Sequence, residues 1–392
     1  MTEASSGGRR AGGRGRWLLG AVAVVVLATG ACSPFYVARA GWEQAKILAA
    51  RESLTDVMTD PETDAETRGK LRLVRDARHF AIDELDFRNA GDSYTSVAFL
   101  EADTLALVLS AAHQDRLSFR TWWFPIVGRV PYRAYFSEES AHEAKASLQD
   151  EGYDTHLRPT AAFSTLGWFS DPLYSTVLRR DEVGVVETVL HELAHQHLFI
   201  PGHGRFNESF ATFAGHVAAK EFFCRREGGG PDTVWCRRAQ DRWLDVQDVS
   251  RHMDGLETEI RDLYARYEAG ELSRDELLDE RDRTYARGQT RFREEVQPNL
   301  RASTYQGLAD EPFNNATFLA RVLYYHRLPD FQALLDENGG DVAATLAYVR
   351  DEAPELDDPF DLLPAGPFAG RLVPPRAMAI FQGSTFIGHR PQ

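Results

Sequence analysis

The spacing of apolar residues predicts helices at both ends of the chain and strands in between. From Gly41 to about Ala90, apolar residues recur mostly at intervals of three and four, as in an amphipathic helix pair. Aromatic and β-branched residues separated by turn-forming residues follow, which favours strands. The predicted strands are Thr95–Leu109, Trp122–Val130, Tyr132–Phe136 and, after a helix that begins at the N-cap candidate Ser137, Ala161–Phe169.

The second half of the chain is predicted to be helical. Helical spacing resumes at 181–199 and 208–223, and an apolar stripe continues through the strongly charged segment 237–300. Both charge signs alternate there, which indicates a helical hairpin turning near 270–273 rather than a nucleic-acid arm. A solvated structural insertion is favoured over a partner-docking arm. Residues from 354 onward are rich in proline and glycine and are expected to wrap the surface.

The first 31 residues have the charge order and length of an export signal. Arginines precede an apolar run, Trp17–Ala28, which is too short to span a bilayer comfortably. Cys32 follows small residues, as in the lipobox of bacterial lipoproteins, although Thr29 stands where leucine is usual. We therefore expect a lipid on Cys32 and anchorage to a bacterial membrane, facing the periplasm or exterior. An ordinary secretory peptide and an uncleaved anchor are the alternatives, and both also export the chain.

The charge balance argues against nucleic acid as a partner. The chain carries a formal net charge of −15, and its first 31 residues contribute +3, so the remainder carries −18. No basic stripe compensates for this acidity. The composition, 43% hydrophobic and 26% charged, is that of a globular protein with one large core or two modest ones.

The two remaining cysteines, Cys224 and Cys236, flank a turn-prone stretch at 228–231. An exported compartment permits a disulfide between them, joining the end of one helix to the start of the next. A zinc pair is the alternative, but no second Cys or His pair lies nearby at ligand spacing. The sequence therefore favours the disulfide.

The segment His191-Glu192-Leu193-Ala194-His195 carries the candidate chemistry. Residues four apart on a helix lie on one face, so His191 and His195 present two imidazoles to one point. Glu192 flanks that point, where its carboxylate is placed to take a proton from a water that a zinc ion acidifies. The alternative is that the two histidines fall at this spacing by chance.

A catalytic zinc ion requires a third protein ligand, for which Glu208 is the candidate. The helix breaks at Pro201–Gly204, and Asn207 is suited to cap the next helix, which places Glu208 in its first turn. The alternative is an acidic residue favoured only by the helix dipole. His203 is the second candidate, and His197 is expected to be solvated or to support the ligands.

At this point the chain resembles the bacterial zinc aminopeptidase family of envelope lipoproteins, which is classed with gluzincin-like metallopeptidases. The resemblance extends from about Tyr36 to about Arg350. The matching stretches are Leu73–Ala81, Trp123–Phe136 (with Ala134 in place of an expected glycine), Ser164–Pro172, His191–Gln196, Phe206–Ala211 and Asn314–Ala316.

The resemblance implies that His191, His195 and Glu208 bind one zinc ion and that Glu192 is the base in peptide hydrolysis. Aminopeptidase activity follows from the family name alone, so endopeptidase activity stays open. Tyr324 is a candidate oxyanion donor, with a core tyrosine as the favoured alternative. Ser164–Phe169 is a candidate edge strand for the substrate or an equally plausible buried strand. A non-catalytic envelope scaffold with a structural zinc site is the competing function.

We therefore expect an α+β, zincin-like fold, mostly helical with a small mixed sheet and an added charged helical hairpin. The expected partners are peptides and the membrane, with no nucleic acid. The expected divisions are a signal peptide at 1–31, a peptidase core at 33–236, the hairpin at 237–300, a C-terminal helical part of the core at 301–353 and a tail at 354–392.

Overall fold

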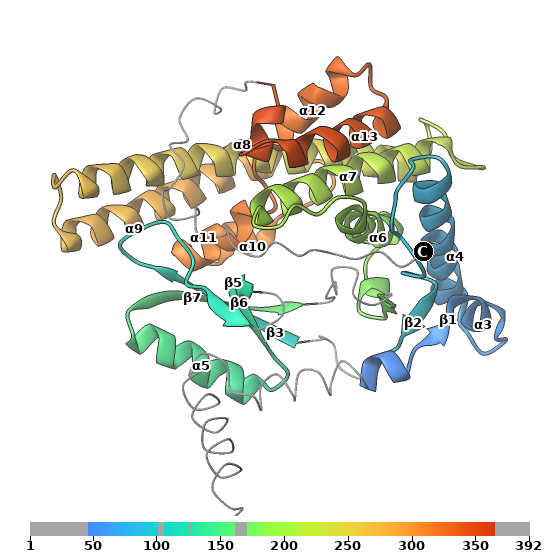
Figure 1. The fold of residues 1–392 in the computed structure, drawn as a ribbon, viewed down its shortest axis with the longest axis horizontal. Coiled ribbons are helices and arrows are strands. Elements are labelled where there is room, and N and C mark those ends of the chain that lie inside the picture. The colour runs from blue at the N-terminus through green and yellow to red at the C-terminus, as the bar shows by residue number, and fades with distance from the viewer. Residues whose placement is uncertain (1–45, 101–105, 125–127, 161–170, 365–392) are drawn as a thin grey trace, which may run out of the picture.

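The computed structural model describes residues 46–100, 106–124, 128–160 and 171–364 (Figure 1). Helices and strands follow each other in an α+β order. The strands are β1 (Glu52–Ser53), β2 (Ser96–Ala98), β3 (Ala106–His113), β4 (Trp122–Phe124), β5 (Gly128–Val130), β6 (Tyr132–Tyr135), β7 (Tyr153–Thr160) and β8 (Leu173–Tyr174). The helices are α3 (Leu54–Thr59), α4 (Ala65–Asp83), α5 (Glu138–Asp150), α6 (Glu182–His197), α7 (Gly204–Arg225), α8 (Val234–Glu268), α9 (Arg274–Arg291), α10 (Gln306–Asp310), α11 (Asn315–Val322), α12 (Leu328–Glu337) and α13 (Val342–Glu352).

The main sheet lies between α5 and the helical layer that contains α11 (Figure 1). It is antiparallel, in the order β6-β3-β7. Its apolar face packs on α5 through Leu109, Ala111 and Leu148. Since side chains alternate along a strand, the next residues of β3 and β7 face α11. The sheet therefore has one apolar face turned to α5 and one face turned to α11.

Two short sheets complete the β structure. The small mixed sheet has the order β1-β2-β8, with β2 parallel to β8, and β4 pairs with β5 as a separate antiparallel ribbon. The predicted single strand Thr95–Leu109 is therefore wrong: β2 and β3 belong to different sheets. The predicted strand Trp122–Val130 is also wrong as a single strand, because β4 and β5 are its two antiparallel halves.

The strand β7 follows α5 and was not predicted. In its sequence, Tyr-Asp-Thr-His-Leu-Arg-Pro-Thr, every second residue from Asp154 to Arg158 is polar or charged, and these residues face the helical layer rather than the apolar core on α5. The predicted strand Ala161–Phe169 lies outside the described residues. The predicted helix from Ser137 is present as α5, with the Ser137 hydroxyl accepting a hydrogen bond from the Ser140 amide.

The helices α6 and α7 pack side by side at the centre of the larger core (Figure 1). Gly215 makes this close approach possible, because an added Cβ would lie 3.0 Å from the Glu187 carbonyl oxygen and 3.1 Å from the His191 Cβ. The predicted α6 is confirmed within two residues at its C-terminal end.

The charged segment forms the predicted helical hairpin, α8 and α9, which turns at the positive-φ residue Gly270 (Figure 1). A capping box at Ser273 begins α9. Its apolar stripe is buried in a second core, which it shares with Leu308, Phe318 and Val322. The expectation of a solvated segment does not hold for this apolar stripe, which helps to form the second core.

Asn315 joins the hairpin to the main sheet. It is fully buried, and its side-chain amide donates to the His113 carbonyl oxygen (2.7 Å) and the Tyr264 hydroxyl (2.6 Å). Its Oδ1 accepts from the Tyr285 hydroxyl at 2.8 Å, and its backbone amide donates to Asp154 at 2.9 Å. The Asn-Asn-Ala stretch therefore has a structural role: Asn314 caps α11, and Asn315 links two layers.

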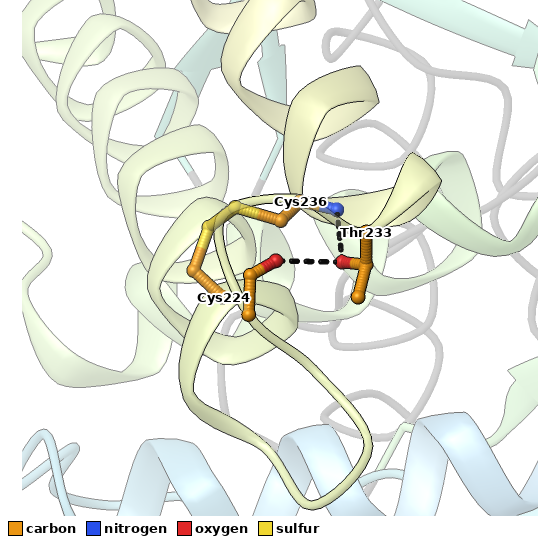
Figure 2. The surroundings of a disulfide bond; sticks show 4 residues. Cys224, Thr233 and Cys236 are labelled. Carbon is orange, nitrogen blue, oxygen red and sulfur yellow. Dashed lines mark hydrogen bonds between the residues drawn. A yellow bond between two sulfur atoms is a disulfide. The ribbon is translucent and has the colours of Figure 1, made fainter.

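Cys224 at the end of α7 and Cys236 in the first turn of α8 form a disulfide, as Figure 2 shows. Thr233 begins α8 by accepting a hydrogen bond from the Cys236 amide and donating one to the Gly230 carbonyl oxygen. The expected signal peptide, Cys32 and most of the tail lie outside the described residues. Among the helices described, none has both the length and the apolar character needed to cross a membrane.

Candidate metal centre

The side chains of His191, His195 and Glu208 converge on one point. Both histidine Nε2 atoms lie 3.5 Å from Glu208 Oε2, and one potential ligand atom from each residue lies within 4.8 Å of the others. Zinc bonds of 2.0–2.1 Å in a tetrahedron place neighbouring ligand atoms about 3.4 Å apart. The donor set and its spacing therefore fit a zinc ion with one position left for water or substrate.

The cluster is enclosed but reachable. The side chains of His191, His195 and Glu208 are 18%, 8% and 27% exposed. His191 and His195 come from consecutive turns of α6, with their rings 4.9 Å apart and nearly perpendicular. Such partial exposure leaves a route for a ligand while limiting water around the metal ligands.

Within the cluster, Glu208 favours the charged form of His195, and the two histidines favour the charged form of Glu208. Burial by itself lowers the pKa of His195, but the adjacent Glu208 carboxylate outweighs burial and raises it. Burial likewise raises the pKa of Glu208, yet His195 and His191 together hold it well below its ordinary value. Glu208 is therefore an anion at neutral pH, the form in which a carboxylate binds a metal ion.

The loop between α6 and α7 sets the position of Glu208. Asn207 does not cap the helix as predicted, because α7 already begins at Gly204 with His203 as its N-cap. Instead, the Asn207 side chain accepts from the Ile200 amide (2.9 Å) and donates to the Ile200 carbonyl oxygen (2.8 Å). This pair of bonds closes the loop and orients the turn that presents Glu208.

Two other predicted positions lie away from the three ligands. His203 occupies the N-cap position of α7 without a side-chain capping bond, and it is not part of the cluster. His197 is buried rather than solvated: its ring stacks on Phe87 at 4.8 Å, and its Nδ1 accepts from the Arg88 amide at 3.1 Å. His197 therefore anchors the loop after α4 against the end of α6.

Tyr324 lies beside the candidate ligands. Its ring stacks at 6.2 Å from that of His191, and it follows the end of α11. It belongs to none of the apolar clusters formed by the described residues, so the core-tyrosine alternative is not supported. The charge of Glu208, followed by burial, raises the pKa of Tyr324, so its hydroxyl is protonated at neutral pH.

Tyr132 of β6, which is 42% exposed as a whole residue, is close enough to Glu208 and Glu192 to interact with their charges. Burial, followed by the charge of Glu208, raises its pKa, and Glu192 adds to that effect. Glu192 also contributes to the raised pKa of Tyr94, after burial. Sequence reasoning did not single out Tyr132, because its importance depends on the pairing of β6 with β3.

A second group of potential ligands lies within the fold: Asp254, Glu257 and His326. Asp254 accepts from His326 Nδ1 at 2.6 Å and from the Arg327 amide at 3.0 Å. Glu257 forms a two-pronged ion pair with Arg205 and a further bond with Arg261. Arginines therefore satisfy the charge of this group, which the sequence interpretation did not identify.

The residues that position α6 were also missed. Glu187, one turn before His191, lies 3.1 Å from His216 of α7 and 2.8 Å from Arg242 of α8. The sequence did contain a sign of the contact between α6 and α7. Ala211 and Gly215 are small residues four apart on α7, a spacing that allows another helix to approach closely.

Taken together, these features define an α+β protein with a two-histidine, one-carboxylate cluster between two central helices. A family model described as "Putative aminopeptidase" matches residues 35–355, and the chain therefore belongs to this family. The description points to peptide hydrolysis, and it agrees with the aminopeptidase family and the extent of resemblance inferred from sequence. No match was found among curated proteins or among solved structures.

Proposed function

We propose that this protein is a zinc-dependent peptidase in which His191, His195 and Glu208 bind the metal ion and Glu192 is the general base. The observation that carries the proposal is the convergence of both Nε2 atoms on Glu208 Oε2 at 3.5 Å. The adjacent position of Glu192 in the motif and the family match support it. A purely structural zinc site would have no use for Glu192.

Different residues of the site have different proposed roles in the reaction. A bound zinc ion would supply a Lewis acid that polarises the scissile carbonyl and lowers the pKa of water. Glu192 accepts a proton from the attacking water and passes it to the leaving amine. Tyr324, protonated at neutral pH, is placed to donate a hydrogen bond to the oxygen that gains negative charge.

Removal of single amino acids from a free N-terminus is the form of the activity that we propose. The family description carries this choice over endopeptidase activity. An exopeptidase also needs an anionic or polar group that holds the substrate ammonium. The products of a peptide mixture decide between the two activities, because an aminopeptidase releases free amino acids and an endopeptidase releases internal fragments.

The protein is further proposed to act outside the cytoplasm, attached by a lipid on Cys32 to a bacterial membrane. The signal-like N-terminus supports this placement, although it lies outside the described residues. The disulfide between Cys224 and Cys236 is consistent with an oxidising compartment.

The test compares the purified full-length protein with Glu192→Ala. We expect the parent to bind one zinc ion and to hydrolyse peptides. The variant should keep zinc and lose activity by a factor of 100 or more, on the order expected for a lost general base. Zinc content and product release are measured together. Absence of zinc, or cleavage that survives the substitution, would falsify the proposed mechanism and favour a non-catalytic envelope protein.

A further inference from the structure

The turn between α11 and α12 carries Tyr324 near its beginning, and α8 holds the end of this turn. Asp254 accepts a hydrogen bond from the Arg327 amide at 3.0 Å, and the Ser250 hydroxyl accepts one from the Leu328 amide at 3.1 Å. Arg327 has a left-handed backbone conformation, with φ 53°, which is uncommon for a residue other than glycine. The end of the turn is therefore fixed by side chains of α8.

The beginning of the same turn is bonded to α7 through Ser209. The Ser209 hydroxyl donates to the Leu323 carbonyl oxygen at 3.1 Å, although the two residues are 114 apart in sequence, and Ser209 is fully buried. Leu323 is the C-cap of α11, and carbonyl groups at a helix C-terminus have no partner within their own helix. Serine hydroxyls inside helices often bond instead to a carbonyl of their own preceding turn. The bond from Ser209 is therefore a specific connection between two distant segments.

Ser209 joins two parts of the candidate metal centre. It directly follows Glu208 on α7, and its bonding partner Leu323 directly precedes Tyr324. The Tyr324 ring lies 6.2 Å from the His191 ring, with 26° between the two planes. One turn of α7 therefore supplies both the proposed ligand Glu208 and the hydrogen bond that holds the backbone next to Tyr324.

We propose that Ser209 is a positioning residue that acts through Tyr324. This inference rests on the proposed peptidase function, in which the Tyr324 hydroxyl donates a hydrogen bond to the oxygen that gains negative charge. Such a donor has to lie about 2.7–3.1 Å from that oxygen, and a displacement of about 1 Å can reduce the rate about 100-fold. The bond from Ser209 to Leu323 limits how far the backbone at Tyr324 can move from the metal ligands. Ser209 itself needs no contact with the substrate.

The test is a double-mutant cycle on zinc-saturated, full-length protein. A library of tripeptides identifies the substrate that the parent hydrolyses fastest, and kcat and KM are measured on that peptide. Tyr324→Phe removes the proposed donor and should lower kcat about 100-fold. Ser209→Ala should lower kcat about tenfold and leave KM within about threefold. Combined with Tyr324→Phe, Ser209→Ala should lower kcat by no more than about twofold further, because no donor remains to be positioned.

Two further measurements do not depend on activity. The zinc Kd of Ser209→Ala should stay within about threefold of the parent value, which separates an effect on Tyr324 from an effect on Glu208. Amide hydrogen exchange of residues 323–327, followed by mass spectrometry, should become about fivefold faster, as expected for the loss of one hydrogen bond.

A matched control removes a buried hydroxyl elsewhere in the fold. The Thr345 hydroxyl on α13 is fully buried and donates to the Asp341 carbonyl oxygen at 2.7 Å, so Thr345→Val should lower the melting temperature without changing kcat. Alanine favours a helix more than serine does, so Ser209→Ala should fold. Ser209→Cys keeps a weak donor and should retain part of the lost rate. Thermal melting checks that each variant is folded.

The proposal is overturned if Ser209→Ala leaves kcat unchanged, or lowers it by the same factor with and without the Tyr324 hydroxyl. It is also overturned if kcat falls only in proportion to weakened zinc binding, because Ser209 would then act through Glu208. An unchanged kcat in Tyr324→Phe would overturn the role of Tyr324 and this inference with it. Failure of the peptidase function has a different signature: the parent would hydrolyse no peptide, or Glu192→Ala would be as active as the parent.

Discussion

Two clusters of histidine and carboxylate side chains lie in this fold, and they differ in what surrounds them. His191, His195 and Glu208 are 8–27% exposed, and no arginine pairs with Glu208 among the described residues. The side chains of Asp254, Glu257 and His326 are 2–3% exposed, and Glu257 is paired with two arginines. Proximity of ligand-type residues is common to both clusters, so it does not by itself define a metal site.

The two clusters differ in whether arginines already neutralise the carboxylate. Arg205 and Arg261 occupy the lone pairs that Glu257 would offer to a metal ion, so this second cluster joins α7, α8 and the turn after α11 as a structural network. Among the described residues, Glu208 forms ion pairs with His191 and His195 and with no arginine, which leaves its carboxylate available for the proposed metal ion. Arg205 precedes Glu208 by three residues, so the structural cluster also anchors the turn that presents the proposed ligand.

The largest expected effect distinguishes the clusters by stability. Glu257→Ala should lower the free energy of unfolding by about 3–5 kcal/mol, because it leaves Arg205 partly buried without a counterion. Glu208→Ala in metal-free protein should change it by about 1 kcal/mol or less, since its histidine partners can become neutral. Urea unfolding of both variants measures the difference. Equal losses would show that both clusters are primarily structural.

A zinc titration has the second largest expected effect and compares the two clusters by metal binding. Free zinc at 100 times its Kd should stabilise the protein by about 2.7 kcal/mol, at one ion per chain. Glu208→Ala should abolish this increase, while Asp254→Asn, which keeps the shape of the side chain, should retain it. Differential scanning calorimetry with and without zinc measures both variants. A second bound ion, or loss of the zinc effect in Asp254→Asn, would contradict the assignment of the clusters.

The smallest expected effect concerns acid stability of the hairpin core. Burial, with help from Arg291, lowers the pKa of His252 from 6.5 to about 4. Between these values the unfolded chain binds a proton that the folded chain does not, so stability is full above about pH 6.5 and falls as the pH approaches 4. His252→Gln should flatten this part of the pH profile of unfolding. An unchanged profile would show that other groups cause the loss.

The local elements of the site were predictable, while its surroundings were not. The spacing of His191 and His195 depends only on helix geometry, and a search for the nearest downstream acidic residue in a helix leads to Glu208. The position of Tyr132 depends on the register of β6 against β3, which no local pattern specifies. The charged residues of β7 even concealed the strand, because their partners are remote in sequence.

The same limit explains the error about the hairpin. Its charged composition predicts a solvated surface, but the apolar stripe of both helices is buried in a second core that includes residues of α10 and α11 from beyond residue 300. Asn207 shows a related case on a smaller scale. Its residue type suits a helix cap, but its side chain does not cap α7 because it forms two hydrogen bonds with Ile200 across the loop.

The bridge between Cys224 and Cys236 has a practical consequence for limited proteolysis. It encloses Arg225 at the end of α7 and the α7–α8 connection, which contains Arg226 and the exposed Gly228. A protease that cuts within this connection would leave two fragments joined covalently. A nicked molecule would therefore migrate as one band on a non-reducing gel and as two bands after reduction, and apparent resistance to digestion has to be judged from the reduced sample.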